Sequence, residues 1–267
     1  AHKEQMEYCN QIKKLYPEYF DGVYILDAGS LDINGNNQYL FTNSHYIGVD
    51  IGEGKNVDII SKIHELQLPD HTFDTIISTE VFEHDQYYTE SIKNIYRMLK
   101  PGGIFLFTCA TTGRPEHGTS RTKPQDAPLI QNHKEWQDYY KNLTEDDIKE
   151  IFNLNDYFSK FQFITNQDSC DLYFYGIKSG TWQKRTNRSF HIYNNKIFNS
   201  KIIFFGASSA LAKKFNLLKE MNIIPDYICD NDINKHGKEV ESYIIHNPEI
   251  LFNQDEEFIV IITSSFI

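Results

Sequence analysis

The sequence predicts an α/β fold in which helices cover both faces of a mainly parallel sheet. Short apolar runs at residues 23–27, 46–49, 75–78 and 104–108 alternate with helical or irregular segments, as strand-helix repeats require. The run at 75–78 contains no charge, which is typical of a strand buried on both faces of a parallel sheet. Pro101-Gly102-Gly103 ends a helix and turns the chain into the next buried strand.

Helical spacing and capping residues predict the other elements of this domain. Apolar residues recur at helical intervals over residues 3–16, and this helix either caps a ligand pocket or packs on the sheet edge. Thr144 precedes three acidic residues, which predicts a helix start before Ile148 to Phe152. A further helix and the last two strands of the domain are expected at residues 86–99, 161–164 and 172–177.

Composition limits the classes of function. A chain of 267 residues with 40% hydrophobic content buries enough core for one large domain or two smaller ones. No apolar stretch approaches a membrane span and the first residues have no signal-peptide character, so a cytoplasmic protein is expected. The net charge of −11 disfavours nucleic acid and favours small molecules. The four cysteines are scattered and predict neither a zinc site nor a disulfide framework.

The stretch from Ile25 to Asp50 predicts a cofactor site. An apolar strand runs into Asp27-Ala28-Gly29-Ser30, and the next strand ends on Asp50, 23 positions after Asp27 (50 − 27). This spacing is close to the roughly 20 residues that separate a glycine turn from a ribose-binding acid in nucleotide folds. The alternative is an ordinary strand-to-turn boundary, which also uses Asp-x-Gly.

The charge of this loop indicates which cofactor binds. Asp27 and Asp32 crowd the position where a dinucleotide would place its pyrophosphate anion, and the second and third glycines of a dinucleotide fingerprint are absent. A cationic ligand fits better. S-adenosyl-L-methionine carries a sulfonium and an ammonium group and still offers a ribose diol to Asp50.

Residues 23–110 resemble the class I S-adenosylmethionine-dependent methyltransferases, in the type found with bacterial capsular and surface polysaccharides. The resemblance rests on an unbroken order of segments, among them Phe73-Asp74-Thr75-Ile76-Ile77-Ser78, Thr79-Glu80-Val81-Phe82-Glu83-His84 and Met98-Leu99-Lys100-Pro101-Gly102-Gly103. It implies a Rossmann-like methyltransferase sheet and these cofactor-binding positions: Asp27, Gly29, Ser30, Asp50, Ile51, Ile63, Thr79 and Glu80.

The resemblance also implies individual roles. Asp27 and Gly29 would line the methionine end, Asp50 would accept hydrogen bonds from the ribose hydroxyls, and Ile51 would pack on the adenine. Lys62-Ile63 stands where the family often has an acid and a small residue. Because lysine accepts no hydrogen bond, the adenine contact must come from the Ile63 backbone or another side chain.

A long loop, residues 111–142, leaves the carboxyl end of the strand at 104–108, the edge where such sheets bind ligands. Its first part, residues 111–123, carries three cations against one acid in an otherwise acidic chain. The planar guanidinium groups make Arg114 and Arg121 candidates for holding a small anionic acceptor. The alternative is a solvated surface loop.

Two histidines are candidates for the general base that methyl transfer to a hydroxyl requires. His84 ends the Thr79–His84 run at the predicted acceptor side, and His117 lies in the basic loop. Glu83 would orient one of them. The three residues are also of types that share a divalent ion, but their spacing does not require one, and no metal is predicted.

A second unit is expected after a linker. The expected division is a methyltransferase domain at 1–180, a polar linker at 181–200 and an α/β module at 201–267. Lys201–Phe205 and the turn Gly206-Ala207-Ser208-Ser209 resemble Rossmann-like sugar-nucleotide or CoA-binding modules of polysaccharide enzymes. The module covers three or four strands, so either the chain is a fragment of a longer protein or the module completes the first sheet.

Two functions follow from these patterns. The first is O-methylation of a phosphorylated, phosphoramidate or nucleotide-linked carbohydrate-type acceptor in capsular or surface polysaccharide biosynthesis. The second is a catalytically silent, nucleotide-sensing scaffold of the same fold, suggested by Leu31 at a glycine position, by Lys62 and by the appended module.

Overall fold

The chain folds into two compact units, Ala1–Lys184 and Arg185–Ile267. The computed structural model describes residues 2–183, 191–193, 196–198, 201–220, 223–253 and 258–263. The expected linker, residues 181–200, therefore lies partly outside the described residues. Its described part includes two short paired strands, β8 (His191–Tyr193) and β9 (Lys196–Phe198).

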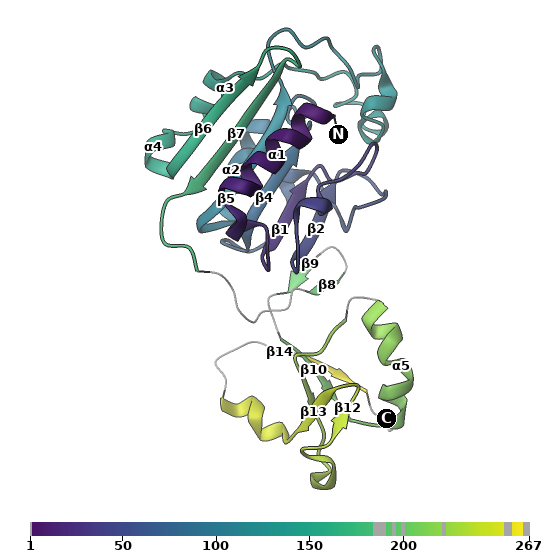
Figure 1. Ribbon diagram of the computed structural model, residues 1–267. Coiled ribbons are helices and arrows are strands. Elements are labelled where there is room, and N and C mark those ends of the chain that lie inside the picture. Colours follow the sequence, from purple (N-terminus) through teal and green to yellow (C-terminus); the bar gives the residue numbers. More distant parts are fainter. Residues whose placement is uncertain are drawn as a thin grey trace. The chain divides into compact units, whose positions relative to one another are not determined.

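The first unit is built on a seven-stranded sheet, which confirms the predicted α/β class (Figure 1). The strands are parallel except β7, which runs antiparallel to both neighbours. In spatial order they are β3 (Ile59–Ile60), β2 (His45–Asp50), β1 (Tyr24–Ala28), β4 (Phe73–Thr79), β5 (Leu99–Ala110), β7 (Asp171–Lys178) and β6 (Phe158–Asn166). The chain order reverses between β1 and β4, and open sheets of this kind bind ligands at that point.

Helices cover both faces of this sheet, as predicted. Helix α1 (Lys3–Leu15) buries Tyr8, Cys9 and Ile12 against one face, where Ile104 and Leu106 of β5 join the same core. The alternate β5 residues point to the other face, because side chains of a strand alternate. That face is covered by α2 (Tyr88–Met98), whose apolar side is buried.

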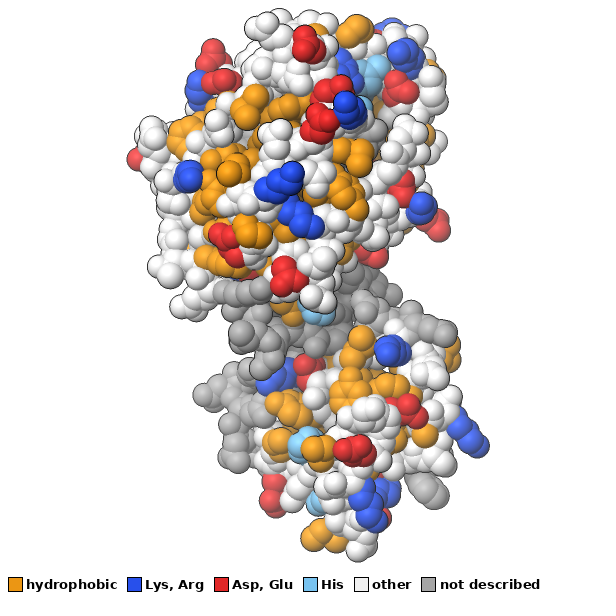
Figure 2. Space-filling view, viewed as in Figure 1, with side chains coloured by type: hydrophobic (Ala, Val, Ile, Leu, Met, Phe, Trp, Pro, Cys, Tyr) orange, Lys and Arg blue, Asp and Glu red, His pale blue; other side chains and the backbone are white. Residues whose placement is uncertain are grey.

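Hydrophobic side chains also reach the surface of the first unit, on the face of the molecule shown in Figure 2. Met6 and Leu15 of α1 are 38% and 63% exposed, and Ile164 of the edge strand β6 is 39% exposed. A single helix is too narrow to cover this side of a seven-stranded sheet. Scattered exposed apolar residues of this kind are normal in folded proteins.

Local sequence signals place the helix ends. Helix α2 ends at Met98, and β5 begins at Leu99, before Pro101. Thr144 caps α3 (Glu145–Lys149) in a reciprocal capping box with Asp147, as its sequence position predicts. The described residues also form α4 (Leu154–Tyr157) and short 3-10 helices at Pro17–Tyr19, Gln38–Leu40, Ile63–Glu65, Pro124–Asp126, Leu129–Asn132, Ile233–Lys235 and Pro248–Asn253.

The second unit has a five-stranded sheet of its own with helix α5 (Ser209–Glu220). In spatial order its strands are β12 (Glu239–Val240), β13 (Tyr243–His246), β11 (Tyr227–Cys229), β10 (Lys201–Phe205) and β14 (Phe258–Ile262), all parallel except β12. Residues 264–267, the end of the expected module, lie outside the described residues. In the described parts of both units, no helix is long and apolar enough to span a membrane.

Candidate functional site

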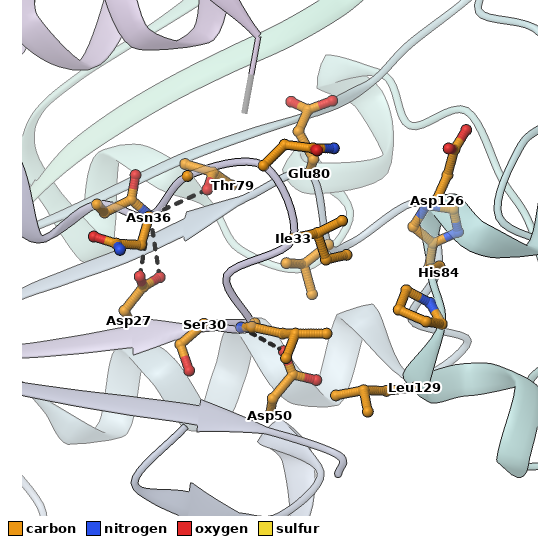
Figure 3. A pocket seen from close by; sticks show the side chains of 18 of the residues that line it. Asp27, Ser30, Ile33, Asn36, Asp50, Thr79, Glu80, His84, Asp126 and Leu129 are labelled. Atoms are coloured by element: carbon orange, nitrogen blue, oxygen red, sulfur yellow. Dashed lines mark hydrogen bonds between the residues drawn. The ribbon is translucent and has the colours of Figure 1, made fainter. Parts of the chain in front are cut away.

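A cavity of about 180 Å³ opens at the carboxyl ends of β1, β2 and β4 in the first unit (Figure 3). Asp27 and Asp50, from the ends of neighbouring strands, face it, and His84 lies on the side away from Asp27. A smaller cavity of about 50 Å³ shares Gly29, Asp50 and His84 with the first. All eight predicted cofactor positions line one cavity or the other. Asp27, Ser30, Thr79 and Glu80 line the larger, Ile51 and Ile63 the smaller, and Gly29 and Asp50 both.

Asp27 lies fully buried at one end of the larger cavity. Its carboxylate accepts hydrogen bonds from Tyr46 and from the side-chain amide of Asn37, at 3.1 and 3.2 Å for the latter. The same amide donates to Thr79 at 3.1 Å, so Asn37 joins the ends of β1 and β4. Burial raises the pKa of Asp27 to about 7, although these hydrogen bonds oppose the rise.

This pKa predicts that ligand affinity depends on pH. Near pH 6 the empty pocket holds mostly neutral Asp27, and an ammonium group binds better to the ionised form, so binding releases a proton. The affinity for S-adenosylhomocysteine should rise about tenfold per pH unit below about pH 7 and flatten above it. Calorimetric titrations across this range measure the slope.

The matched variant is Asp27→Asn, which keeps the shape of the side chain but cannot ionise. Its affinity should be weak and independent of pH over the same range. A wild-type affinity that does not change with pH would show that Asp27 does not meet the ligand's cationic group.

The turn after β1 brings the backbone close to the ligand space. Gly29 has a φ of +87°, and a Cβ at this position would lie 2.1 Å from Cγ2 of Val81. The amides of Gly29 and Ser30 both donate to Val49 O, which ties the turn to β2. The Ser30 hydroxyl is buried beside the cavity and has no hydrogen-bond partner among the described residues. It lies against Gly48 of β2, where an added Cβ would be 2.5 Å from it.

Asp50 is held by backbone amides and keeps accepting capacity. Its Oδ2 accepts from Leu31 N at 3.0 Å and its Oδ1 from Ile51 N at 2.8 Å. Each carboxylate oxygen has a second lone pair, so the group can take two hydroxyl donors at once. Burial raises the pKa of Asp50, and the two backbone donors counteract the shift.

The smaller cavity has apolar walls and one buried acid. Ile51, Ile63 and Trp136 line it, and the carboxylate of Asp85 lies at the same cavity. The Asp85 oxygens accept from Tyr87 N and from the Ser91 hydroxyl, at 2.8 and 2.5 Å. Sequence reasoning left the adenine contact open, and Asp85 is a side chain near Ile63 that can accept a hydrogen bond.

Glu80 occupies a strained position at the end of β4. Its φ is +58°, a left-handed conformation that costs a non-glycine residue roughly 1–2 kcal/mol. The carboxylate accepts from the Thr108 hydroxyl at 2.7 Å and lies 3.6 Å from His2 Nε2. Burial alone would raise the pKa of Glu80, but His2 and Thr108 hold it below its usual value.

Helix α1 reaches the cavity through Gln5, which the sequence did not indicate. Gln5 is 1% exposed and lines the larger cavity, and neither its amide nitrogen nor its oxygen has a hydrogen-bond partner among the described residues. An orphaned buried amide costs free energy that a polar ligand recovers. Of the two placements predicted for this helix, the structure therefore favours capping the pocket.

Replacing Gln5 by leucine tests this placement. The change keeps side-chain size but removes the amide, and a lost hydrogen bond of about 1 kcal/mol should weaken S-adenosylhomocysteine binding roughly five- to tenfold. Thermal stability should not fall, because a buried orphaned amide is removed. Gln11→Leu, at an exposed position of the same helix, is the control and should leave binding unchanged. Equal affinities of the two variants would remove Gln5 from the site.

The loop between β5 and α3 closes one side of the pocket through apolar residues. Leu129 and Ile130 line the larger cavity, and Leu129 lies on its Asp50 side in Figure 3. Neither was predicted.

The two arginines predicted to hold an acceptor lie outside both cavities and have acidic partners. Arg114 is 3.0 Å from buried Asp171 and donates to Ser169 O at 2.6 Å. Arg121 is 56% exposed and pairs with Glu116 and Asp138, at 3.3 and 3.4 Å.

Glu83, His84 and His117, predicted as the catalytic residues, come together beside the larger cavity, which His84 lines. One ligand atom from each lies within 4.8 Å of the other two, and the histidine rings are 5.0 Å apart and perpendicular. Burial raises the pKa of Glu83 well above its usual value, and the negative charge of Glu80 adds to the shift. Burial, together with His117, lowers the pKa of His84 to about 3, so this ring is neutral at pH 7 and a weak base.

The comparisons with known proteins agree with this location. Residues 26–107, which include the end of β1, all of β2 and β4 and most of β5, match a family model described as a methyltransferase domain. No curated protein matches the chain significantly. The matched residues include the ends of β1, β2 and β4, where the larger cavity opens.

Several solved structures are similar to the first unit at low sequence identity. One is the 1,6-didemethyltoxoflavin-N1-methyltransferase of Burkholderia thailandensis, with 16% identity, a TM-score of 0.47 and coverage of 66% of this chain and 79% of that one. Phosphoethanolamine N-methyltransferase 2 of Haemonchus contortus has 15% identity and a TM-score of 0.45, and the match covers 65% of this chain and 53% of that one. An S-adenosylmethionine-dependent methyltransferase of Aquifex aeolicus has 15% identity and a TM-score of 0.42, and the match covers 64% of this chain and 89% of that one.

Proposed function

We propose that the first unit transfers a methyl group from S-adenosylmethionine to a hydroxyl of a small acceptor. The methyltransferase domain uses S-adenosylmethionine as its cofactor. The observation that carries the proposal is Asp50: a part-buried carboxylate at the end of β2, held by two backbone amides, keeps one lone pair on each oxygen for the ribose hydroxyls.

The two cavities fit the two ends of this cofactor. Adenine would occupy the smaller cavity between Ile51, Ile63 and Trp136, with Asp85 able to accept from its amino group. The methionine end would occupy the larger cavity, where ionised Asp27 meets the ammonium group and the Gln5 amide meets the carboxylate. The sulfonium then lies among carboxylates and has no opposing cation in the cavity lining.

Methyl transfer requires an in-line approach of the acceptor oxygen and removal of its proton. His84 lines both cavities, so the acceptor would bind on its side, with His117 and Glu83 behind it. The low pKa of His84 makes it a poor base by itself. His117, part-exposed in the basic loop, is the better candidate of the two histidines.

For the acceptor we propose a phosphorylated, phosphoramidate or nucleotide-linked carbohydrate of capsular or surface polysaccharide biosynthesis. Support comes from the sequence resemblance and from the cations of residues 111–123. An anionic acceptor must exchange with the acids that hold Arg114 and Arg121. Arg121 is the more accessible, because both of its acidic partners are themselves at the surface.

Calorimetric titration of the whole chain with S-adenosylhomocysteine is the first test, since it needs no knowledge of the acceptor. Micromolar or tighter binding supports the proposal. Undetectable binding, together with tight binding of a nucleotide that carries no methionine, would support a catalytically silent scaffold instead.

Transfer of labelled methyl groups from S-adenosylmethionine to sugar phosphates and nucleotide sugars is the second test, with unphosphorylated sugars as matched controls. Methylation restricted to the phosphorylated compounds supports the acceptor class, and equal methylation of both sets would remove it.

A further inference from the structure

The cluster of Glu83, His84 and His117 has no internal hydrogen bonds to explain its burial. Glu83 is 0% exposed, and neither of its carboxylate oxygens has a hydrogen-bond partner among the described residues. His84 is 8% exposed, and its Nδ1 is likewise buried and without a partner. Two adjacent residues thus bury three polar atoms that have no hydrogen-bond partner among the described residues, although the backbone amides of Glu83 and Ala110 favour the charged form of Glu83.

Such atoms are costly unless something else satisfies them. The three side chains offer one carboxylate oxygen and two imidazole nitrogens that converge within 4.8 Å. Ligand atoms around a tetrahedral zinc ion lie about 3.5 Å apart, since each bond is about 2.0–2.2 Å long. Small rotations of the side chains would close the cluster to this size.

His117 is oriented as a metal-binding histidine usually is. Its Nδ1 lies 3.1 Å from Pro115 O. A proton on Nδ1 that is donated to this carbonyl leaves the lone pair on Nε2, and outer hydrogen bonds of this kind fix the tautomer of histidine ligands. The Tyr140 hydroxyl donates to the same carbonyl at 3.3 Å.

The other group of acids and histidine in the described residues differs in one respect. His2, Glu80 and Asp171 also converge, but Arg114 already lies 3.0 Å from Asp171 and 4.0 Å from Glu80. A resident guanidinium supplies the positive charge that a metal ion would bring. No arginine or lysine donates a hydrogen bond to Glu83 in the described part of the chain, and Arg114 acts on Glu83 only through its more distant charge.

We propose that Glu83, His84 and His117 bind a divalent first-row transition metal ion, of which Zn²⁺ is the representative, at the acceptor side of the larger cavity. Two imidazoles and one carboxylate suit this class of ion better than Mg²⁺ or Ca²⁺, which prefer oxygen ligands alone. Three protein ligands leave a coordination position for a further group, as in catalytic zinc sites. His84 lines both cavities, so this position is accessible to an acceptor.

The role of the ion rests on the proposed methyl transfer, although its binding does not. An acceptor hydroxyl on the ion would lose its proton to solvent water more readily than in free solution, so His117 would serve as a ligand of the ion in place of its role as the general base. The alkoxide oxygen then forms the new bond to the methyl carbon. The carbon-sulfur bond breaks with its electron pair on sulfur, and neutral S-adenosylhomocysteine leaves.

The test is Zn²⁺ binding by the full chain after treatment with a chelator and dialysis. We expect one equivalent to bind tightly and the thermal midpoint to rise with Zn²⁺ concentration. Co²⁺ should bind in place of Zn²⁺ and give the strong visible absorption that is typical of four-coordinate Co²⁺. Glu83→Gln, which keeps the shape of the side chain, should weaken Zn²⁺ binding on the order of 100-fold, and so should His117→Ala.

Two controls make the result specific. His2→Ala, from the group that holds Arg114, should bind Zn²⁺ as the wild type does. S-adenosylhomocysteine titration of every variant shows whether the cofactor pocket is intact. His117 is only partly buried, so His117→Ala stands in if Glu83→Gln does not fold.

The outcomes separate the two proposals. Zn²⁺ binding that is equally tight in the wild type, Glu83→Gln and His117→Ala would overturn the metal site, even if S-adenosylhomocysteine binds well. Zn²⁺ binding that requires the cluster supports the site. If S-adenosylhomocysteine then fails to bind, the proposed methyltransferase function falls and the metal site stands.

Discussion

Replacing Asp50 by alanine is expected to lower the affinity for S-adenosylhomocysteine about 100-fold or more. The carboxylate is the proposed acceptor for two ribose hydroxyls, and a hydrogen bond to a charged group contributes about 1.5–3 kcal/mol. The substitution also leaves the amides of Leu31 and Ile51 without their acceptor, which loosens the turn beside the cavity. Calorimetric titration measures the change.

Two further variants make this prediction specific. Glu53→Ala removes the same charge from an exposed position three residues away and should bind as the wild type does. Asp50→Asn keeps a carbonyl oxygen and should lose about tenfold, since one acceptor remains. If Asp50→Asn is folded and binds with wild-type affinity, Asp50 is not the ribose ligand.

Replacing Gly29 by alanine is expected to destabilise the first unit by about 2–4 kcal/mol and to abolish cofactor binding. The positive φ of +87° costs alanine about 1 kcal/mol. The new methyl group would also lie 2.1 Å from Cγ2 of Val81, and relief of such overpacking costs about 1–3 kcal/mol. Val81 lines both cavities, so its displacement fills the ligand space.

Gly113→Ala is the control that separates the cost of backbone strain at positive φ from the cost of the steric clash with Val81. Gly113 also has a positive φ, of +96°, but its added Cβ would lie 3.2 Å from the Cys170 sulfur, which needs to move by only a few tenths of an ångström, so a loss of about 1 kcal/mol, mainly conformational, is expected. Chemical denaturation of both variants, with titration of S-adenosylhomocysteine, measures the two effects. If Gly29→Ala and Gly113→Ala lost equal stability, Val81 would move away from the new methyl group without a cost in free energy, and the turn would tolerate a Cβ.

The predicted cofactor positions show that the local sequence pattern is enough to identify the residues at the ends of the strands. A strand, a glycine turn and an acid at the end of the next strand place Asp27, Gly29 and Asp50 at one sheet edge, because the ends of neighbouring parallel strands coincide. The structure places all three in the lining of the larger cavity. The main elements were also predicted to within a few residues, because alternation, caps and proline act over short distances.

Charge counting along the loop was less informative about the acceptor side. Three cations in residues 111–123 indicated an open anion site, yet Arg114 pairs with Asp171 on β7. The partner lies far along the chain, and a count of local charges contains no information about it. The same holds for Gln5, whose entry into the cavity depends on how α1 packs across the sheet.

The sequence by itself determined the α/β class, the order of the main elements and the strand-end residues of the cofactor pocket, since these depend on spacing and periodicity within short segments. Only the tertiary structure decided that Gln5, Leu129 and Ile130 close the pocket and that His117 meets Glu83 and His84. These contacts join segments that are far apart in the chain. The packing of α1 and of the loop between β5 and α3 against the sheet brings these segments together.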